Sequence, residues 1–424
     1  MADLFGPVSR DERQDECIQN WIKSKGKATC VAATGFGKTR IATKLIGKLL
    51  NKRGNLSIFI VVPTTTLKEQ WETLLDQLGF GLNCTVEVIN TAIKSNHICD
   101  LLIIDEAHRA AADTFSSIFV KTKYTYILCL TATIERLDGK EEIIKHYCPV
   151  CDTVTLEDCL MNGWVSQYKE YQVLIDVDDI DTYKELNRQF TEHFGFFNFD
   201  MGLVLSMTGP KGYLIRNSYR DKLCPNGSPE EKSAILVSIM YHSISFMRVL
   251  QARKKFINNH QKKVEIARKI IEARPNAKII TFSNNIAMAE SIGIGKVYSG
   301  KDTKKKGRAT LEELQTGDIR VINTVAKANE GLDIPDLSIA IMLGIDSSKI
   351  KATQRVGRVA RKFGNKQSEI FNIVINNTVE TEWFKKSHTK SNYITIDEEG
   401  LEQVLRGEEP TPYKKKIPKL TFRF

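Results

Sequence analysis

Long apolar runs are missing from this sequence. No stretch of consecutive apolar residues approaches the roughly eighteen that a membrane-spanning helix needs, and the first residues form no apolar core of signal-peptide length. Internal repeats and long low-complexity linkers are also missing. We therefore expect no membrane association, and a protein of the cytoplasm, in a bacterial or phage-infected cell, or of the nucleus.

Cysteine is present, but without the pattern of a disulfide framework. The nine cysteines are an odd number, scattered along a chain with no secretion signal. Four residues have a spacing that would suit zinc, although a second knuckle with further ligands is not evident: His146, Cys148, Cys151 and Cys159. We expect small, half-buried cysteines in a connecting segment and no metal site there.

Length and charge narrow the class further. The 424 residues exceed the size at which one hydrophobic core keeps growing, so two domains with smaller additions are expected. Lys and Arg number 61 against 51 Asp and Glu, a net charge of +10. This balance favours a polyanionic partner such as nucleic acid, and a solvated basic surface is the alternative.

A phosphate-binding loop is the clearest chemical feature of the first third. The stretch Ala32–Arg40, AATGFGKTR, follows a short apolar strand and opens a helix that extends to about Leu50. Glycines let backbone N–H groups approach phosphate oxygens closely, and a helix start presents its positive end to them. Lys38 can then reach the outer phosphates of a nucleotide, and Thr39 can place its hydroxyl on Mg²⁺.

Two adjacent carboxylates end a second apolar strand, residues 101–104. They are Asp105 and Glu106, followed by Ala107 and His108. Buried carboxylates are costly unless a cation lies beside them, so Asp105 is the predicted magnesium partner. Glu106, which the metal does not occupy, is placed to polarise the attacking water. A purely structural carboxylate pair is the alternative.

Two further apolar strands, residues 57–62 and 126–130, also end in hydroxyl-bearing residues. Such groups could hold a nucleic-acid phosphate, while capping of the next helix by Thr64 is an equally good local interpretation. Strands and helices alternate through the first 150 residues. The pattern predicts an α/β fold with a parallel sheet and a site along its carboxyl edge.

Several segments, in order, resemble the motifs of superfamily 2 helicases and translocases. AATGFGKT, VVPTTTLKEQW, DEAH and LTATIERLDG are similar to motifs I, Ia, II and III. KIITFS at 278–283, VINT with EGLDIP at 321–335, and QRVGRVAR at 354–361 are similar to motifs IV, V and VI. The resemblance spans residues 10 to 365 and implies two RecA-like P-loop lobes with a mainly helical insertion between them. It divides the chain into an ATP-binding lobe at 1–168, an insertion or arm with possible DNA contact at 169–263, a second lobe at 264–395 and a basic tail at 396–424.

The resemblance also implies residue roles. Nucleotide contacts fall on the loop, on the second lobe and on Gln14, with Gln19 a weaker competitor: Gln14, Thr34, Gly35, Phe36, Gly37, Lys38, Thr39, Arg40, Gly331 and Asp333. Catalytic roles fall on Glu106, Lys38, Gln354, Arg358 and Arg361, with both arginines on one face of a predicted helix. Nucleic-acid contacts fall on Pro63, Thr64, Thr91, Ser283 and Thr324. His108, Thr131 and Thr133 would couple the nucleotide site to the strand-binding surface.

The subfamily follows from TATIERLDG and the segments HYCPV and LMNGWV after it. They resemble members that act on double-stranded DNA: the XPB type, phage recombination helicases of the UvsW type, and the motor subunits of restriction enzymes. The implied protein is an ATP- and Mg²⁺-dependent, monomeric DNA helicase or translocase that unwinds or branch-migrates duplex, forked or junction DNA, in recombination, repair or replication. The alternatives are an RNA helicase or remodeller, and an ATP-switched nucleic-acid clamp without processive unwinding.

Two segments outside the motifs carry their own expectations. Five phenylalanines gather within residues 190–199. They predict either the aromatic core of a helical insertion or a wedge that opens base pairs by stacking. The segment KDTKKKGR, residues 301–308, predicts a basic loop of the second lobe.

Overall fold

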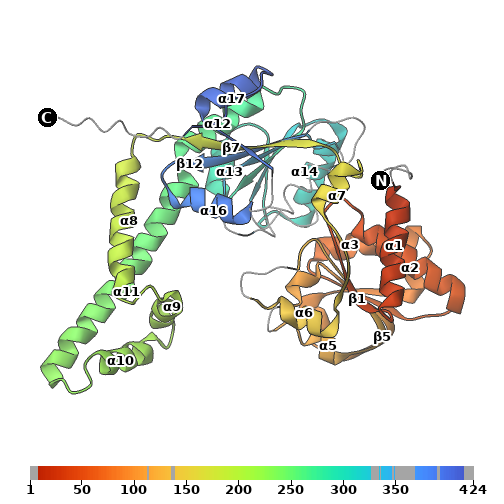
Figure 1. Cartoon of the computed structure of the whole chain (residues 1–424), viewed down its shortest axis with the longest axis horizontal. Helices are drawn as coiled ribbons and strands as arrows, with labels where there is room; N and C mark the ends of the chain where they lie inside the picture. The colour runs from red at the N-terminus through yellow and green to blue at the C-terminus, as the bar shows by residue number, and fades with distance from the viewer. Residues whose placement is uncertain are drawn as a thin grey trace, which may run out of the picture.

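Two separate parallel sheets organise the molecule (Figure 1). The structure is a computed structural model, and it describes residues 8–414 except 112–113, 135–138, 326–333, 335, 346–347, 349–367 and 389–391. Both sheets are flanked by helices, which confirms the predicted α/β fold with two RecA-like lobes.

The first lobe contains a six-stranded sheet in the order β3-β2-β4-β5-β1-β6, with every neighbouring pair parallel. Its strands are β1 (Lys27–Ala32), β2 (Ile58–Val62), β3 (Cys84–Val88), β4 (His97–Asp105), β5 (Thr122–Thr131) and β6 (Val150–Val154). Its helices are α1 (Arg10–Lys23), α2 (Lys38–Arg53), α3 (Thr65–Gln77), α4 (Ile89–Ala92), α5 (Ile118–Lys121), α6 (Glu141–Tyr147) and α7 (Leu156–Met161), with two 3₁₀ turns, η1 (Gly81–Asn83) and η2 (Ala107–Arg109).

The central strands read as continuous apolar runs because the sheet is covered on both faces. Successive side chains of a strand point to opposite faces. In β2, Ile58 and Ile60 pack into the core that contains α1 and α2, whereas Phe59 and Val61 pack into the core on the other face. The carboxyl ends of β1, β4 and β5 therefore meet at one edge, which positions the site described below.

The second lobe contains a seven-stranded sheet in the order β13-β7-β12-β11-β8-β10-β9, also parallel throughout. Its strands are β7 (Tyr168–Ile175), β8 (Ile279–Ser283), β9 (Lys296–Tyr298), β10 (Val321–Val325), β11 (Ile339–Met342), β12 (Ser368–Ile375) and β13 (Ile394–Ile396). Its helices are α12 (Gln261–Glu272), α13 (Ile286–Ser291), α14 (Lys304–Thr316), α16 (Val379–Ser387) and α17 (Glu398–Leu405).

An arm of four helices extends from the second lobe (Figure 1). It is built from α8 (Ile180–Gly195), α9 (Met201–Thr208), α10 (Gly212–Leu223) and α11 (Pro229–Asn259). The domain division drawn from the sequence differs here, because residues 169–175 pair in β7 with β12 and β13 and so belong to the second sheet. The arm is an insertion within the second lobe, after its first strand, and does not join the two lobes.

The arm has a small core of its own. Phe197, Val204, Met207 and Phe246 are buried in it, and other phenylalanines of the 190–199 cluster pack against them. Phe199 is the exception, with 60% of its surface exposed. The structure thus favours the aromatic core as the explanation for most of the cluster.

By length and composition alone, one helical stretch of the described residues, 229–272, is apolar enough to cross a membrane. In the fold this stretch is α11, which packs on α8, followed by α12 of the second lobe.

Residues 398–405 form α17, and Tyr413 N–H donates to Thr395 O at 2.7 Å, so the described part of the predicted tail packs on the second lobe.

Candidate nucleotide site of the first lobe

The loop between β1 and α2 needs glycine for two physical reasons. Gly35 and Gly37 have φ angles of 92° and 102°, in the left-handed region that side chains disfavour. In addition, a Cβ at residue 37 would lie 2.7 Å from Gln14 Nε2. The loop can therefore approach α1 this closely only with glycine at that position.

Side chains of helix α1 donate hydrogen bonds to backbone carbonyl groups of the loop. Arg10 Nε donates to Phe36 O and Arg10 Nη2 to Gly35 O, both at 2.8 Å, and Gln14 Nε2 donates to Phe36 O at 2.9 Å. Arg10 and Gln14 are four residues apart and so share a helix face. Sequence reasoning selected Gln14 but missed Arg10, because its contact with the loop depends on how α1 packs against it.

Some side chains of the phosphate loop pack into the hydrophobic core, and others lie at the candidate nucleotide site. Phe36 is fully buried against Trp164, with ring centroids 5.3 Å apart, so this residue serves the loop through its backbone. Thr34 Oγ1 is buried and has no hydrogen-bond partner among the described atoms. Because buried polar groups are normally hydrogen-bonded, this hydroxyl indicates a place that a bound ligand completes. Arg40 is exposed on α2.

Asp105 ends β4 with only 6% of its surface exposed. Its Oδ2 accepts a hydrogen bond from Trp71 Nε1 at 3.0 Å, and its Oδ1 accepts one from the Glu106 N–H at 2.9 Å. Burial and the charge of Glu106 raise the pKa of Asp105 to about 6, against the opposing effects of Lys38 and the indole N–H. A divalent cation would stabilise the ionised form, and carboxylate and hydroxyl oxygens are donors that suit magnesium.

Glu106 connects the loop to the strand ends. Its φ of 49° places it in the left-handed region, and its Oε1 lies 3.7 Å from Lys38 Nζ. Its Oε2 is buried without a hydrogen bond in the described residues, 3.5 Å from His108 Nδ1. Lys38, Asp105 and Glu106, selected from the sequence, thus lie together at one edge of the sheet, and Thr39 follows Lys38 in the first turn of α2.

The three residues predicted to couple nucleotide to nucleic acid also meet. His108 Nδ1 lies 3.2 Å from Thr131 Oγ1, which donates to Thr133 O at 2.7 Å. Register explains the proximity, because Asp105 of β4 pairs with Leu130 of β5. A continuous polar path therefore leads from Glu106 to the end of β5.

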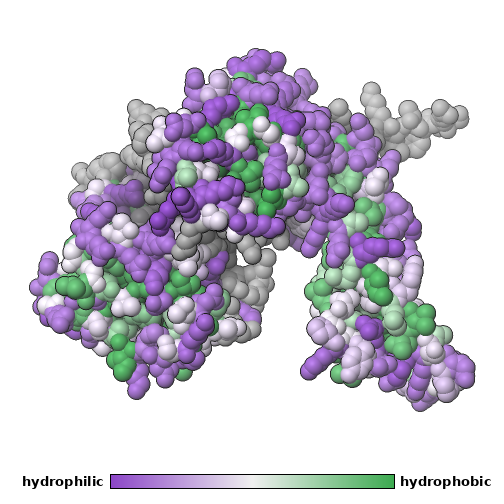
Figure 2. Space-filling model, turned by 180° about the vertical axis from the view of Figure 1, so that it is seen from behind, coloured by the Kyte–Doolittle hydropathy of each residue, from purple (hydrophilic) through white to green (hydrophobic). Residues whose placement is uncertain are grey.

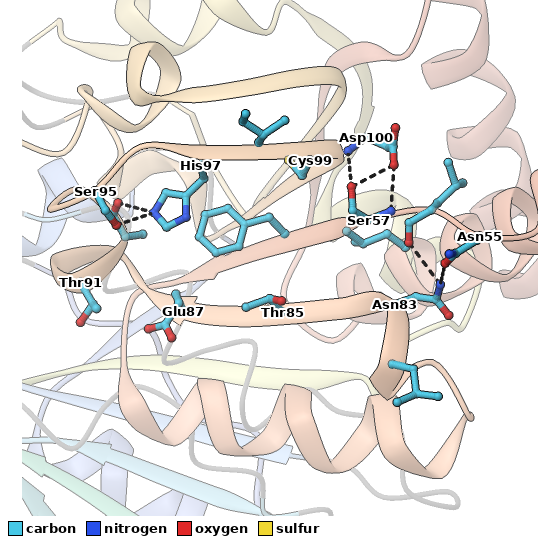
Figure 3. Close-up of a pocket in the computed structure, with 16 residues that line it drawn as sticks. Asn55, Ser57, Asn83, Thr85, Glu87, Thr91, Ser95, His97, Cys99 and Asp100 are labelled. Atoms are coloured by element: carbon cyan, nitrogen blue, oxygen red, sulfur yellow. Dashed lines mark hydrogen bonds between the residues drawn. The ribbon is translucent and has the colours of Figure 1, made fainter.

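The predicted nucleic-acid residues of the first lobe have mostly local roles in the structure. Pro63 is buried, and Thr64 caps α3 by accepting a hydrogen bond from the Leu67 N–H at 3.3 Å. Thr91 is exposed on α4 and lines a groove with Glu87, His97 and further residues (Figure 3). Figure 3 also shows Ser57 and Asp100 hydrogen-bonded at the far end of this groove, where β2 begins, so the groove is distinct from the phosphate loop.

In the second lobe, Ser283 and Thr324 lie at the ends of neighbouring strands, where Thr324 pairs with Phe282. Both are buried, and Thr324 Oγ1 donates to Thr281 O at 2.7 Å, so this hydroxyl is used within the sheet. Ser283 Oγ is buried without a partner in the described residues. The remaining predicted residues lie outside the described part: Gly331, Asp333, Gln354, Arg358 and Arg361.

Comparison with known families agrees with this architecture. Residues 262–363 match the family model described as helicase conserved C-terminal domain, and residues 8–92 and 85–136 match type III restriction enzyme, res subunit. The chain belongs to superfamily 2 of the helicases and translocases. Members of this superfamily hydrolyse ATP with a divalent metal ion, and the loop and carboxylates described above suit that chemistry.

Individual relatives extend over most of the chain. The DNA 3'-5' translocase XPB2 of Sulfurisphaera tokodaii is 27% identical over 389 residues, which are 87% of this chain and 82% of the relative. Transcript termination protein A18 of fowlpox virus is 21% identical over 400 residues, 89% of this chain and 77% of the relative. Among solved structures, S. cerevisiae Dbp5 bound to RNA and ADP BeF3 superposes with a TM-score of 0.58 at 11% identity, covering 93% of this chain and 91% of that one. This last likeness concerns the fold alone.

Proposed function

We propose that this superfamily 2 member is a Mg²⁺-ATP-driven DNA translocase that unwinds or branch-migrates duplex, forked or junction DNA. One observation carries the choice of DNA: the similarity to a DNA 3'-5' translocase extends over 87% of this chain. The net charge of +10 is consistent with a polyanionic substrate.

The chemistry we propose follows the geometry of the first lobe. The N-terminus of α2 and Lys38 bind the outer phosphates, while Thr39 and Asp105 hold the metal ion. Magnesium, when bound there, would neutralise the negative charge that develops on the phosphates during hydrolysis. Glu106 orients the attacking water and accepts its proton, since it lies beside Lys38 but is separate from the metal ligands. Arg358 and Arg361 are proposed to complete the site from the second lobe.

Coupling to DNA is proposed to run through His108. Its Nδ1 lies between Glu106 Oε2, 3.5 Å away, and Thr131 Oγ1, 3.2 Å away. A change in the charge or position of Glu106 during hydrolysis would therefore be transmitted to Thr131 and Thr133 at the end of β5. This path supports a link between hydrolysis and the surface that contacts the strand.

We also propose that the arm contacts DNA through the exposed face of α11. Towards the base of the arm this face carries Arg248, Lys254 and Lys255, all exposed. Further out it presents Tyr241 and apolar residues, and Figure 2 shows apolar surface on the arm. Phosphate contacts by the basic residues and stacking by the tyrosine fit a nucleic-acid partner.

A parallel comparison of substrates tests the proposal. ATP hydrolysis is measured with single-stranded DNA, duplex, fork, four-way junction and RNA, and Lys38→Ala is the inactive control. We expect the largest stimulation with duplex or forked DNA, together with ATP-dependent strand displacement. Stimulation by RNA and not by DNA would establish the RNA alternative, and ATP-dependent binding without displacement on any substrate would establish the clamp.

The contribution of the arm is tested by its salt dependence. Replacing Arg248, Lys254 and Lys255 together by alanine should weaken DNA binding and reduce the slope of log affinity against log salt by about one for each phosphate that is no longer bound. Arg188→Ala on α8 is the matched control, because its guanidinium is paired with Glu185 at 2.8 Å. An unchanged slope in the triple variant would exclude α11 as a phosphate-binding face.

A further inference from the structure

Two sulfur atoms face each other behind the phosphate loop. Cys30 lies in β1 and Cys151 in the neighbouring strand β6, and their Sγ atoms are 3.7 Å apart. The register of these strands shifts between Thr29 and Cys30, so that Cys151 lies at an irregularity of the pairing. A disulfide bond needs the sulfurs at about 2.05 Å, which requires an approach of under 2 Å from the observed positions.

The two thiols differ in access and in chemistry. Cys151 is partly exposed, while Cys30 has only 1% of its surface exposed. The hydrogen bond between the two thiols lowers the pKa of Cys151, and the same hydrogen bond together with burial raises the pKa of Cys30. Because the thiolate is the reactive form, Cys151 is suited to attack an external disulfide and Cys30 to resolve the product.

The pair is connected to the phosphate loop along two paths. Cys30 precedes the loop directly, two residues before the end of β1. Next to Cys151, Asp152 binds Arg13 of α1 through two hydrogen bonds of 2.6 and 2.7 Å. The same helix holds the loop carbonyls through Arg10 and Gln14. A displacement of β6 towards β1 would therefore reach the loop from the strand and from α1.

We propose that Cys30 and Cys151 form a redox-sensitive dithiol, which a small disulfide such as oxidised glutathione converts to an intramolecular disulfide that weakens ATP binding at the loop. Cys151 thiolate attacks one glutathione sulfur, forming a mixed disulfide and releasing one glutathione thiolate. The Cys30 sulfur then attacks the Cys151 sulfur and expels the second glutathione, and the thiol protons pass to the released thiolates or to water. Two electrons move from the dithiol to one oxidised glutathione, which leaves as two reduced molecules.

The expected effect on ATP follows from the hydrogen bonds of α1. Three of them join Arg10 and Gln14 to the loop. Loss of one such hydrogen bond corresponds to about 1.4 kcal/mol, or about a tenfold weaker hold on the nucleotide. We therefore expect the KM for ATP to rise about tenfold on oxidation. This effect rests on the proposed ATPase function, whereas formation of the disulfide does not.

The experiment begins with the fully reduced full-length protein. It is incubated with oxidised glutathione, alkylated, and digested with trypsin without reduction. Mass spectrometry should reveal residues 28–38 cross-linked to residues 146–169, with fragmentation assigning the bond to Cys30 and Cys151. Dithiothreitol should remove the cross-link and restore the KM for ATP.

Variants give the controls. Cys151→Ser should abolish both the cross-link and the change in KM, whereas Cys224→Ser, which alters a partly exposed cysteine of the arm, should leave both intact. A mixed disulfide that persists at Cys151 without closure, or no modification at all, would overturn the dithiol. A cross-link that leaves the KM unchanged would overturn its effect on ATP binding. Because the cross-link is detected by mass alone, its failure is separate from any failure of the proposed ATPase.

Discussion

Trp71 is a positioning residue that the structure adds to the site, and replacing it by phenylalanine is the sharpest test of the proposed metal site. The indole lies on α3 with 2% of its surface exposed, and its N–H donates to Asp105 Oδ2 at 3.0 Å. Trp71→Phe retains an aromatic ring at the position but removes this donor. Asp105 would then keep its burial and the repulsion from Glu106, while one interaction that favours its ionised form is lost.

Two separate magnitudes set the size of the effect. A hydrogen bond to a charged group contributes about 1.5–3 kcal/mol, which corresponds to a factor of roughly 10 to 100 in binding. Loss of an outer partner of a metal ligand typically costs about 10- to 100-fold in metal affinity. Since the two magnitudes agree, the magnesium concentration for half-maximal ATP hydrolysis should rise by about 10- to 100-fold, and excess magnesium should restore most of the maximal rate.

The assay is the initial rate of ATP hydrolysis at saturating ATP over a range of free magnesium. Trp21→Phe is the matched control, because Trp21 is also buried and its Nε1 donates to Ile127 O at 2.9 Å, remote from the carboxylates. Both variants should lose thermal stability, and only Trp71→Phe should change the magnesium dependence. Equal magnesium dependence in the two variants, or a loss of rate that magnesium does not restore, would refute the assignment of Trp71.

Three other substitutions test separate parts of the structure. Glu106→Gln should retain ATP binding, measured by a fluorescent analogue, while hydrolysis falls by on the order of 10² to 10⁴; near-normal turnover would remove the residue from its role. Lys263→Met should lower the free energy of unfolding of the second lobe by about 3–5 kcal/mol in urea titration, because the buried Glu380 carboxylate, 2.5 Å from Lys263 Nζ, loses its cationic partner; the double change with Glu380→Leu should recover much of it. In the arm, His242 Nδ1 lies 3.1 Å from His193 Nδ1, and burial together with His193 lowers the pKa of His242. As the pH falls below about 6.5 the unfolded arm takes up this proton first, so its stability should decrease, seen as faster amide exchange over α8 and α11; His242→Gln should be less sensitive to pH, and equal sensitivity would argue against this titration.

The site residues that belong to the recognised motifs could be predicted from the sequence, because the topology of a parallel sheet determines where they lie. A parallel sheet brings the carboxyl ends of its strands to one edge, so the ends of β1, β4 and β5 must lie near one another. Lys38, Asp105 and Glu106 could therefore be placed together from the order of strands and loops alone. The fold class follows from the same alternation of apolar strands and helices.

Partners contributed by distant helices were not accessible in this way. Trp71 belongs to a segment that was recognised, but its hydrogen bond to Asp105 depends on which face of α3 packs against β4. Arg10 lies outside the recognised motifs, and its bonds to the loop depend on where α1 packs against it. Both interactions are set by packing between elements, which the sequence pattern of either element alone does not contain.

Strand pairing and helix capping explain two other differences between the sequence predictions and the structure. Residues 169–175 were predicted to begin an insertion, yet they belong to β7, in which six of the eight residues are buried and which pairs with β12 over its full length. The basic segment 301–308 was expected to be a loop, but Thr303 accepts a hydrogen bond from the Lys306 N–H and begins α14. A cap residue outweighs the repulsion of neighbouring lysines, since exposed charges in water interact weakly.

The geometry around Glu106 links occupancy of the site to its activity. Each carboxylate oxygen faces a different partner: Lys38 Nζ at 3.7 Å from Oε1, and His108 Nδ1 at 3.5 Å from Oε2. Both distances exceed those of strong hydrogen bonds, so the carboxylate is held by electrostatics and can be released. Phosphate bound at the loop would compete for Lys38 and so free Glu106 Oε1 to accept a hydrogen bond from the attacking water. The lysine proposed to bind ATP would in this way also control the carboxylate proposed to act as the base, and a movement of Glu106 would reach Thr131 through His108.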